Sequence, residues 1–171
     1  SRGLGDVYKR QINNSTDIAE WGEIPTRETD DTVESWNNCI CDFTKNGYRL
    51  PTEAEWEYLA RGGQNFIYSG SDDLDEVGWA LENSDGKLHK GKLKKANNYG
   101  LYDMSGNVAE LCWDLCEYQV AFARACRDQS FRDSTKDLWN VVSFVNLRAF
   151  AEPYNKSASD VGFRVVRIVT E

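Results

Sequence analysis

The polar and hydrophobic residues of segment 47–63 are arranged as in a short helix with a strong start. Thr52 is a good N-cap, and Glu55 stands three positions later, where its carboxylate can complete a capping box. Two glycines at positions 62 and 63 provide a stop. We therefore predict a helix between Thr52 and the glycine pair, with one face formed by Ala54, Trp56 and Leu59.

Two other segments are rich in the residues that strands favour. They are residues 108–113 and residues 163–169, the latter with several β-branched side chains. Residues 65–70 suit a short strand, whereas the polar residues 13–38 are typical of a loop. With few periodic segments and many turn signals, the chain is predicted to be an irregular α+β domain with little regular secondary structure.

Three motifs follow one another along the chain. They are Gly-Tyr-Arg-Leu-Pro-Thr-Glu-Ala-Glu-Trp-Glu-Tyr at residues 47–58, Tyr-Gly-Leu-Tyr-Asp-Met-Ser-Gly-Asn-Val-Ala-Glu at residues 99–110, and Val-Gly-Phe-Arg-Val-Val-Arg at residues 161–167. Together they resemble the formylglycine-generating-enzyme, or sulfatase-modifying-factor, family over residues 16–168. The resemblance implies a C-type lectin-like fold, which serves in this family both enzymes and non-catalytic display scaffolds.

The first eleven residues have a different expected origin from the rest of the chain. Residues 5–11, Gly-Asp-Val-Tyr-Lys-Arg-Gln, are similar to a translated sequencing-library adapter, so residues 1–11 are interpreted as an artefact or tag, with an ordinary polar arm as the alternative. Residues 12–171 are then a single domain that has lost its natural N-terminal part. The localisation stays open, although the resemblance is compatible with a bacterial cell envelope or a secreted protein.

Composition and charge narrow the range of partners. The 171 residues carry a net charge of −8, which argues against a nucleic-acid partner because binding to phosphates needs a basic face. The sequence has no apolar run near the roughly 18 residues that a membrane-spanning helix needs. A membrane-spanning segment is therefore not expected.

The cysteines do not form a recognisable framework. There are five, at positions 39, 41, 112, 116 and 126, and with His89 as the single histidine no zinc-binding set is present. We expect buried free thiols. A bridge involving Cys112 or Cys116 is the alternative.

The second motif contains a candidate metal site. Two carboxylates lie seven positions apart around a glycine turn, and oxygen ligands of this kind suit Ca²⁺. The resemblance implies a structural calcium ion held by the side chains of Asp103 and Glu110 and by the carbonyls of Gly106 and Val108. The alternative is a turn without an ion, in which Asp103 caps the turn and Glu110 pairs with an arginine such as Arg164.

The residues expected for catalysis are missing. The family's oxidation of a substrate cysteine to formylglycine resembles copper chemistry on two thiolates, and soft thiolates select Cu(I). Those cysteines lie in the family before the Gly-Phe-Arg motif, but here residues 130–162 contain none, and the family's Arg-Gly-Gly-Ser is replaced by Arg-Asp-Gln-Ser at residues 127–130. No copper is expected. A copper-dependent oxidase completed by the missing N-terminal part is the alternative function.

The C-terminal region has the composition of a recognition surface. Aromatic residues alternate there with short hydrogen-bonding residues, as in antibody-like loops. We predict that a protein or glycan ligand binds through these loops. The resemblance implies that the residues that vary in the retroelement-diversified proteins of this family lie in the same C-terminal region. The alternatives are that the aromatics belong to the core, or that the domain is a structural module of a surface protein. The predicted ligand-binding residues are Trp139, Asn140, Phe144, Asn146, Arg148, Phe150 and Tyr154.

Overall fold

A computed structural model describes residues 41, 43, 47–118, 121–135, 148–149 and 159–167. The chain forms two compact units, one made of Ser1–Leu50 with Val165–Glu171 and the other of Pro51–Arg164. The proposed tag at residues 1–11 lies outside the described residues.

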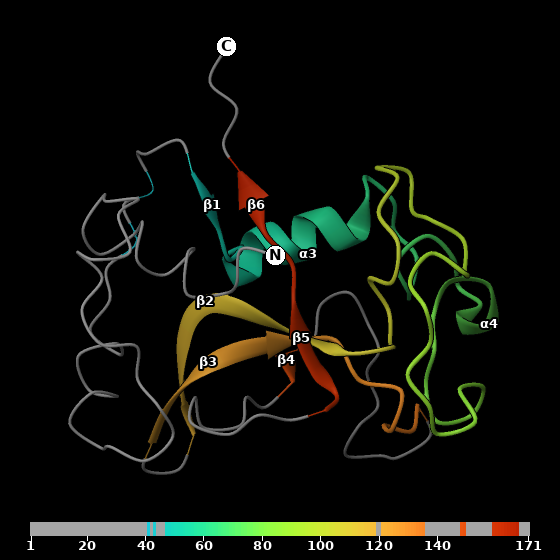
Figure 1. The fold of residues 1–171 in the computed structure, drawn as a ribbon. Helices are drawn as coiled ribbons and strands as arrows, with labels where there is room; N and C mark the ends of the chain where they lie inside the picture. Colours follow the sequence, from blue (N-terminus) through green and yellow to red (C-terminus); the bar gives the residue numbers. More distant parts are fainter. Residues whose placement is uncertain are drawn as a thin grey trace. The chain divides into compact units, whose positions relative to one another are not determined.

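The predicted helix is present as α3, Glu53–Arg61, and it begins and ends as the sequence indicated (Figure 1). Thr52 is the N-cap: its hydroxyl accepts a hydrogen bond from the Glu55 amide at 3.2 Å, and the Glu55 carboxylate accepts one from the Thr52 amide at 2.8 Å. The helix ends at Gly62, whose φ of 56° lies in the left-handed region that glycine tolerates. The prediction of the capping box is confirmed.

The buried face of α3 differs in one residue from the prediction. Trp56 and Ala60 are fully buried and Glu53 nearly so, whereas Ala54 is exposed. The reason is helical geometry, because positions three and four residues apart share a face and positions two apart do not. Ala54 therefore cannot accompany Trp56.

The larger unit contains a four-stranded sheet in the order β4-β3-β2-β5. Strands β2, Ala109–Tyr118, and β3, Ala121–Arg127, form an antiparallel hairpin with a register shift between Leu111 and Leu115. Strand β5, Val161–Phe163, lies parallel to β2, and β4, Arg148–Ala149, pairs with β3. The strand expected at residues 108–113 is thus the first half of a longer one, and β3 was not predicted.

The core of this unit lies between α3 and the hairpin. Its largest member is Trp56, which is buried with small and sulfur-containing side chains from β2, β3 and the preceding loop. Helix α3 contacts both strands of the hairpin. The core residues are Trp56, Ala60, Met104, Ala109, Cys112, Ala125 and Cys126.

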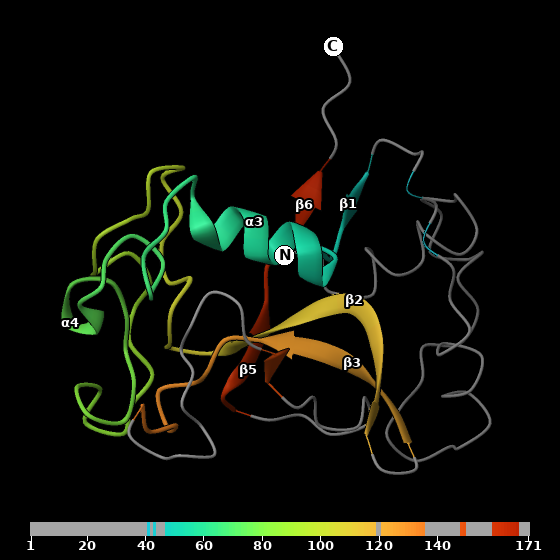
Figure 2. The ribbon, with the colours of Figure 1, turned by 180° about the vertical axis from the view of Figure 1, so that it is seen from behind.

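Residues 62–107 form loops around the short helix α4, Leu74–Val77 (Figure 2). Hydrogen bonds rather than strands hold them together. The Asn97 side chain donates to the Leu59 carbonyl at 2.8 Å and to the Ser69 hydroxyl at 3.0 Å. At residues 65–70, where a short strand was expected, there is only an isolated bridge between Tyr68 and Ser71.

In the described part of the smaller unit, strands β1, Tyr48–Arg49, and β6, Val166–Arg167, pair antiparallel. The strand predicted at residues 163–169 is therefore interrupted, since β5 ends at Phe163 and β6 begins at Val166. In the part of the chain that the structure describes, no helix has the length and apolar character to cross a membrane.

Candidate functional site

The second motif folds as a tight turn that leads into β2. Its backbone uses the left-handed region at Asp103, Gly106 and Asn107, with φ values of 53°, 77° and 70°. Gly106 is required, because a Cβ at this position would lie 2.1 Å from the Trp79 carbonyl oxygen. The turn places Asp103 and Glu110 in the same part of the larger unit.

Glu110 has two partners that come from the other two motifs. Its Oε2 accepts a hydrogen bond from Trp56 Nε1 at 2.7 Å and another from Arg164 Nε, and its Oε1 accepts one from Arg164 Nη2 at 2.6 Å. The same Nη2 donates to the Asp103 carbonyl at 3.2 Å. The pairing of Glu110 with Arg164, which the sequence left open as an alternative, is present.

Asp103 is only partly satisfied. Its Oδ2 accepts the Lys92 amide at 2.8 Å, while its Oδ1 is buried and has no hydrogen-bond partner. An unsatisfied buried oxygen is costly unless a donor or an ion completes its environment.

These observations allow a test of whether the residues fit calcium. A carboxylate has about four acceptor positions, and Glu110 uses three of them for the donors given above, which leaves one on Oε1. The Gly106 carbonyl accepts the Val108 amide at 3.0 Å and retains its second lone pair.

Among the described residues no group of three or more His, Cys, Asp or Glu side chains forms a metal site. Carboxylates and carbonyls are oxygen ligands of the kind that calcium takes, but the Arg164 guanidinium already lies against both Glu110 oxygens. The calcium site stays a prediction.

Asp128 is a third carboxylate near this turn, and it was not among the residues predicted to bind metal. It is buried, has a φ of 67°, and its Oδ2 accepts a hydrogen bond from the Gly106 amide. Burial raises its pKa well above the ordinary range, and the charge of Glu110 raises it further. The signal in the sequence was an aspartate at a position where the family motif has glycine.

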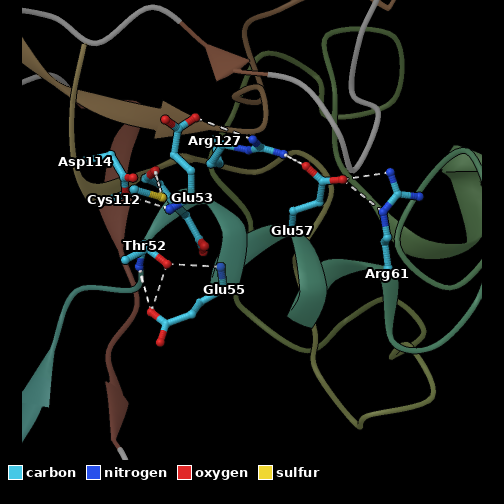
Figure 3. A network of polar contacts seen from close by, with 9 residues as sticks. Thr52, Glu53, Glu55, Glu57, Arg61, Cys112, Asp114 and Arg127 are labelled. Carbon is cyan, nitrogen blue, oxygen red and sulfur yellow. Dashed lines mark hydrogen bonds and ion pairs between the residues drawn. The ribbon is translucent and has the colours of Figure 1, made fainter. Parts of the chain in front are cut away.

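A charged network links α3 to the end of β3 (Figure 3). Arg127 is buried, and its Nη2 lies 2.9 Å from Glu57 Oε2 while its Nη1 lies 3.5 Å from Glu53 Oε2. Glu57 also pairs with Arg61 at 2.8 Å. Asp114 accepts the Glu53 amide at 2.7 Å and so supports the start of the helix. These contacts are structural and were not predicted.

The described cysteines belong to the interior. Cys41, Cys112 and Cys126 are buried, and Cys112 is a free thiol that forms no bridge to Cys116, so the prediction of a buried free thiol is confirmed for Cys112. Burial raises the pKa of the Cys112 thiol, and the nearby Glu53 raises it further. Copper(I) binds thiolates. Cys112 and Cys126 therefore do not fit a copper site, because they are packed in the core.

The predicted ligand-binding residues are not tested by the structure. Arg148 belongs to β4, where it pairs across the sheet with Arg127. The other six lie outside the described residues: Trp139, Asn140, Phe144, Asn146, Phe150 and Tyr154.

Comparison with known proteins identifies the family. The family model for the sulfatase-modifying factor enzyme 1-like domain matches residues 7–169. The chaperone protein LppX of Paenibacillus barcinonensis is 40% identical over 146 residues, which cover 71% of this chain and 50% of that protein. The inactive C-alpha-formylglycine-generating enzyme 2 of Bos taurus is 34% identical over 148 residues, covering 76% and 47%. Proteins named formylglycine-generating enzyme match as well.

The fold is similar to that of a solved structure. Treponema denticola variable protein 1 has a TM-score of 0.67 and 35% identity, covering 76% of this chain and 51% of that protein. The predicted C-type lectin-like fold is thus confirmed. The chain spans about half the length of the curated relatives that it matches. It belongs to the formylglycine-generating-enzyme, or sulfatase-modifying-factor, family.

Proposed function

We propose that this chain is a non-catalytic member of its family and that it binds a protein ligand through its C-terminal region. The observation that carries the proposal is the placement of the thiols. Residues 130–162 contain no cysteine, and Cys112 and Cys126 lie in the core with their thiols buried. A Cu(I) centre would need an accessible thiolate pair, which these two residues do not supply.

The names of the relatives support the same proposal. One is called an inactive formylglycine-generating enzyme, one a chaperone, and one a variable protein. A chaperone acts on another protein, so we favour a protein ligand over a glycan.

Absence of catalysis is tested by incubating the chain with Cu(I), oxygen and a sulfatase-type cysteine peptide. The peptide mass is expected to stay unchanged. A decrease in peptide mass that corresponds to conversion of the cysteine to formylglycine, and that the Cys126→Ser variant no longer produces, would establish oxidase activity instead.

Ligand binding is tested by selecting displayed peptides on the immobilised chain and measuring their Kd by calorimetry. Trp139→Ala and Asn146→Ala are expected to weaken binding, since both residues belong to the predicted recognition surface. Tyr58→Ala is the matched control, because Tyr58 is an aromatic residue that is 64% exposed on α3, outside that surface. Peptides that bind all three variants equally would contradict the proposed surface, and binding only to arrayed glycans would contradict a protein ligand.

A further inference from the structure

Residues 86–95 form a basic loop in an acidic chain. Five of the nine lysines of the sequence lie within residues 87–95, although the net charge of the whole chain is −8. The loop contains no aspartate or glutamate. A chain with this net charge does not need further charges for solubility, so solubility does not account for five like charges in one loop.

The basic loop is held in one conformation by contacts with the residues around it. The ring of His89 stacks on Trp79 with 3.7 Å between the ring centroids, and the backbone amide and carbonyl of His89 bind the Asn107 side chain at 3.0 and 3.1 Å. Further along the loop, the Lys92 amide donates to Asp103 at 2.8 Å. A surface that is already ordered loses little conformational entropy when a partner binds.

The lysines of the loop differ in what their ammonium groups contact. Two are used within the chain, since Lys94 Nζ donates to a backbone carbonyl of α4 at 2.6 Å and Lys95 Nζ lies 3.3 Å from a carboxylate of the same helix (Figure 2). The other three, Lys87, Lys90 and Lys92, are exposed, and none of them forms an ion pair with a described residue. Three positive charges are therefore available to a partner.

Two leucines of the same loop are exposed as well. Leu88 is 58% exposed and Leu93 is 60% exposed, and each follows directly after one of the three available lysines. A single exposed leucine is ordinary in a soluble protein. Two of them in a fixed basic loop add apolar area that a partner can cover, which a purely electrostatic contact does not need.

The charges that flank the loop indicate the class of partner. Asp85 precedes it and is exposed, and so are Asp75 and Glu76 of α4, next to which the loop ends. A nucleic acid or an anionic bilayer would place phosphates against these carboxylates as well as against the lysines. An acidic peptide segment is narrow enough to contact the lysines without meeting the carboxylates.

We propose that residues 87–93 are a docking surface for an acidic segment of a partner protein. The three available lysines pair with its carboxylates, and the two leucines are covered by apolar side chains that lie between those carboxylates. The surface consists of residues outside the C-terminal region proposed above, so it does not rest on that proposal. Because the lysines are exposed, the binding is sensitive to salt.

The test measures the binding of two labelled peptides to the full chain by fluorescence anisotropy. In one peptide glutamates are interspersed with leucines, and in the other glutamines replace the glutamates. The chain is expected to bind the glutamate peptide about tenfold more tightly, and to lose this difference at high salt. Equal affinities for the two peptides at low salt would overturn the proposal.

Variants locate the binding on the loop. Lys87→Gln together with Lys90→Gln is expected to weaken binding of the glutamate peptide by about fivefold. Arg132→Glu is the matched control, because it changes the net charge by the same amount at an exposed residue outside the loop, and it should bind as the wild type does. Equal affinities in the double lysine variant and this control would overturn the role of the lysines.

The apolar part of the contact has its own variant. Leu88→Gln together with Leu93→Gln keeps every charge and is expected to weaken binding of the glutamate peptide by about tenfold, since apolar area is no longer buried. An unchanged affinity would overturn the role of the leucines.

Two other occupants of the loop would give different results. Vesicles of phosphatidylcholine and phosphatidylserine that bind the wild type but not the double lysine variant would assign the loop to a lipid surface. A dimer that is seen by sedimentation velocity, and that the same variant dissociates, would assign it to a second copy of this chain. Either result would overturn the proposal, which expects a monomer that leaves such vesicles unbound.

Discussion

Two arginines bind the same carboxylate in very different surroundings, which gives a sharp prediction. The Arg127 side chain is 6% exposed and lies 2.9 Å from Glu57, whereas the Arg61 side chain is 36% exposed and lies 2.8 Å from the same residue (Figure 3). The two ion pairs have nearly the same length. Their contributions to stability should nevertheless differ, because only one of them is shielded from water.

The expected magnitude follows from what each substitution leaves behind. Removing one partner of a buried ion pair costs about 3–5 kcal/mol. Arg127→Met should cost about 3 kcal/mol, near the lower end of this range. The loss is limited because the Glu57 side chain is 29% exposed and retains Arg61. It is still substantial because the Glu53 side chain, at 10% exposed, is left with a buried charge. Arg61→Met removes an exposed pair within one helix and should cost about 0.5 kcal/mol.

Urea denaturation followed by circular dichroism measures both values, with an unchanged m-value as the condition for comparing them. The double variant Arg127→Met with Glu53→Met should recover part of the loss, since a hydrophobic pair can replace a buried ion pair. Equal losses for Arg127→Met and Arg61→Met would refute the argument, and so would a double variant that is no more stable than Arg127→Met.

Three more predictions concern α3 and the core. Thr52→Ala should lower the free energy of unfolding by about 1 kcal/mol, because the Glu55 amide loses its acceptor, whereas Thr52→Ser should not; no difference between the two variants would contradict the cap. Burial opposes ionisation of Glu57, but its hydrogen bonds to Arg61 and Arg127 outweigh burial and hold its pKa below the ordinary 4.5. The stabilisation by ionised Glu57 is therefore present at neutral pH and lost as the pH falls through the lowered pKa, so the stability difference between wild type and Glu57→Gln should shrink below about pH 4.5. A difference that stays constant across this range would argue against the pairing. Iodoacetamide should label Cys112 far more slowly in the native chain than in urea, as judged by peptide mass, since burial raises the pKa of this thiol; rapid native labelling would show that the thiol is accessible.

The sequence predicted best what depends on neighbouring residues. The capping box joins Thr52 and Glu55, only three positions apart, and its two hydrogen bonds are present. The buried thiols also follow from residue type. The fold class came from motif order, which is a property of the whole chain.

Features that depend on distant residues were missed. Strand β3 forms because β2 lies beside it, and its own sequence, Ala-Phe-Ala-Arg-Ala-Cys-Arg, has weak strand propensity. The contact between Arg127 and Glu57 joins residues 70 positions apart. Asp128 was noted only as a departure from a motif, because neither its left-handed backbone nor its contact with Gly106 can be read from local pattern.

The three family motifs meet at one carboxylate, and this bears on how a motif match should be interpreted. Trp56 comes from the first motif, Glu110 from the second and Arg164 from the third, and both other side chains donate hydrogen bonds to Glu110. None of these contacts involves a thiol or a reacting group. In this chain the motifs therefore hold the scaffold together, so that matching them establishes the fold. The resemblance implies that oxidase activity would depend on cysteines within residues 130–162, and this stretch contains none.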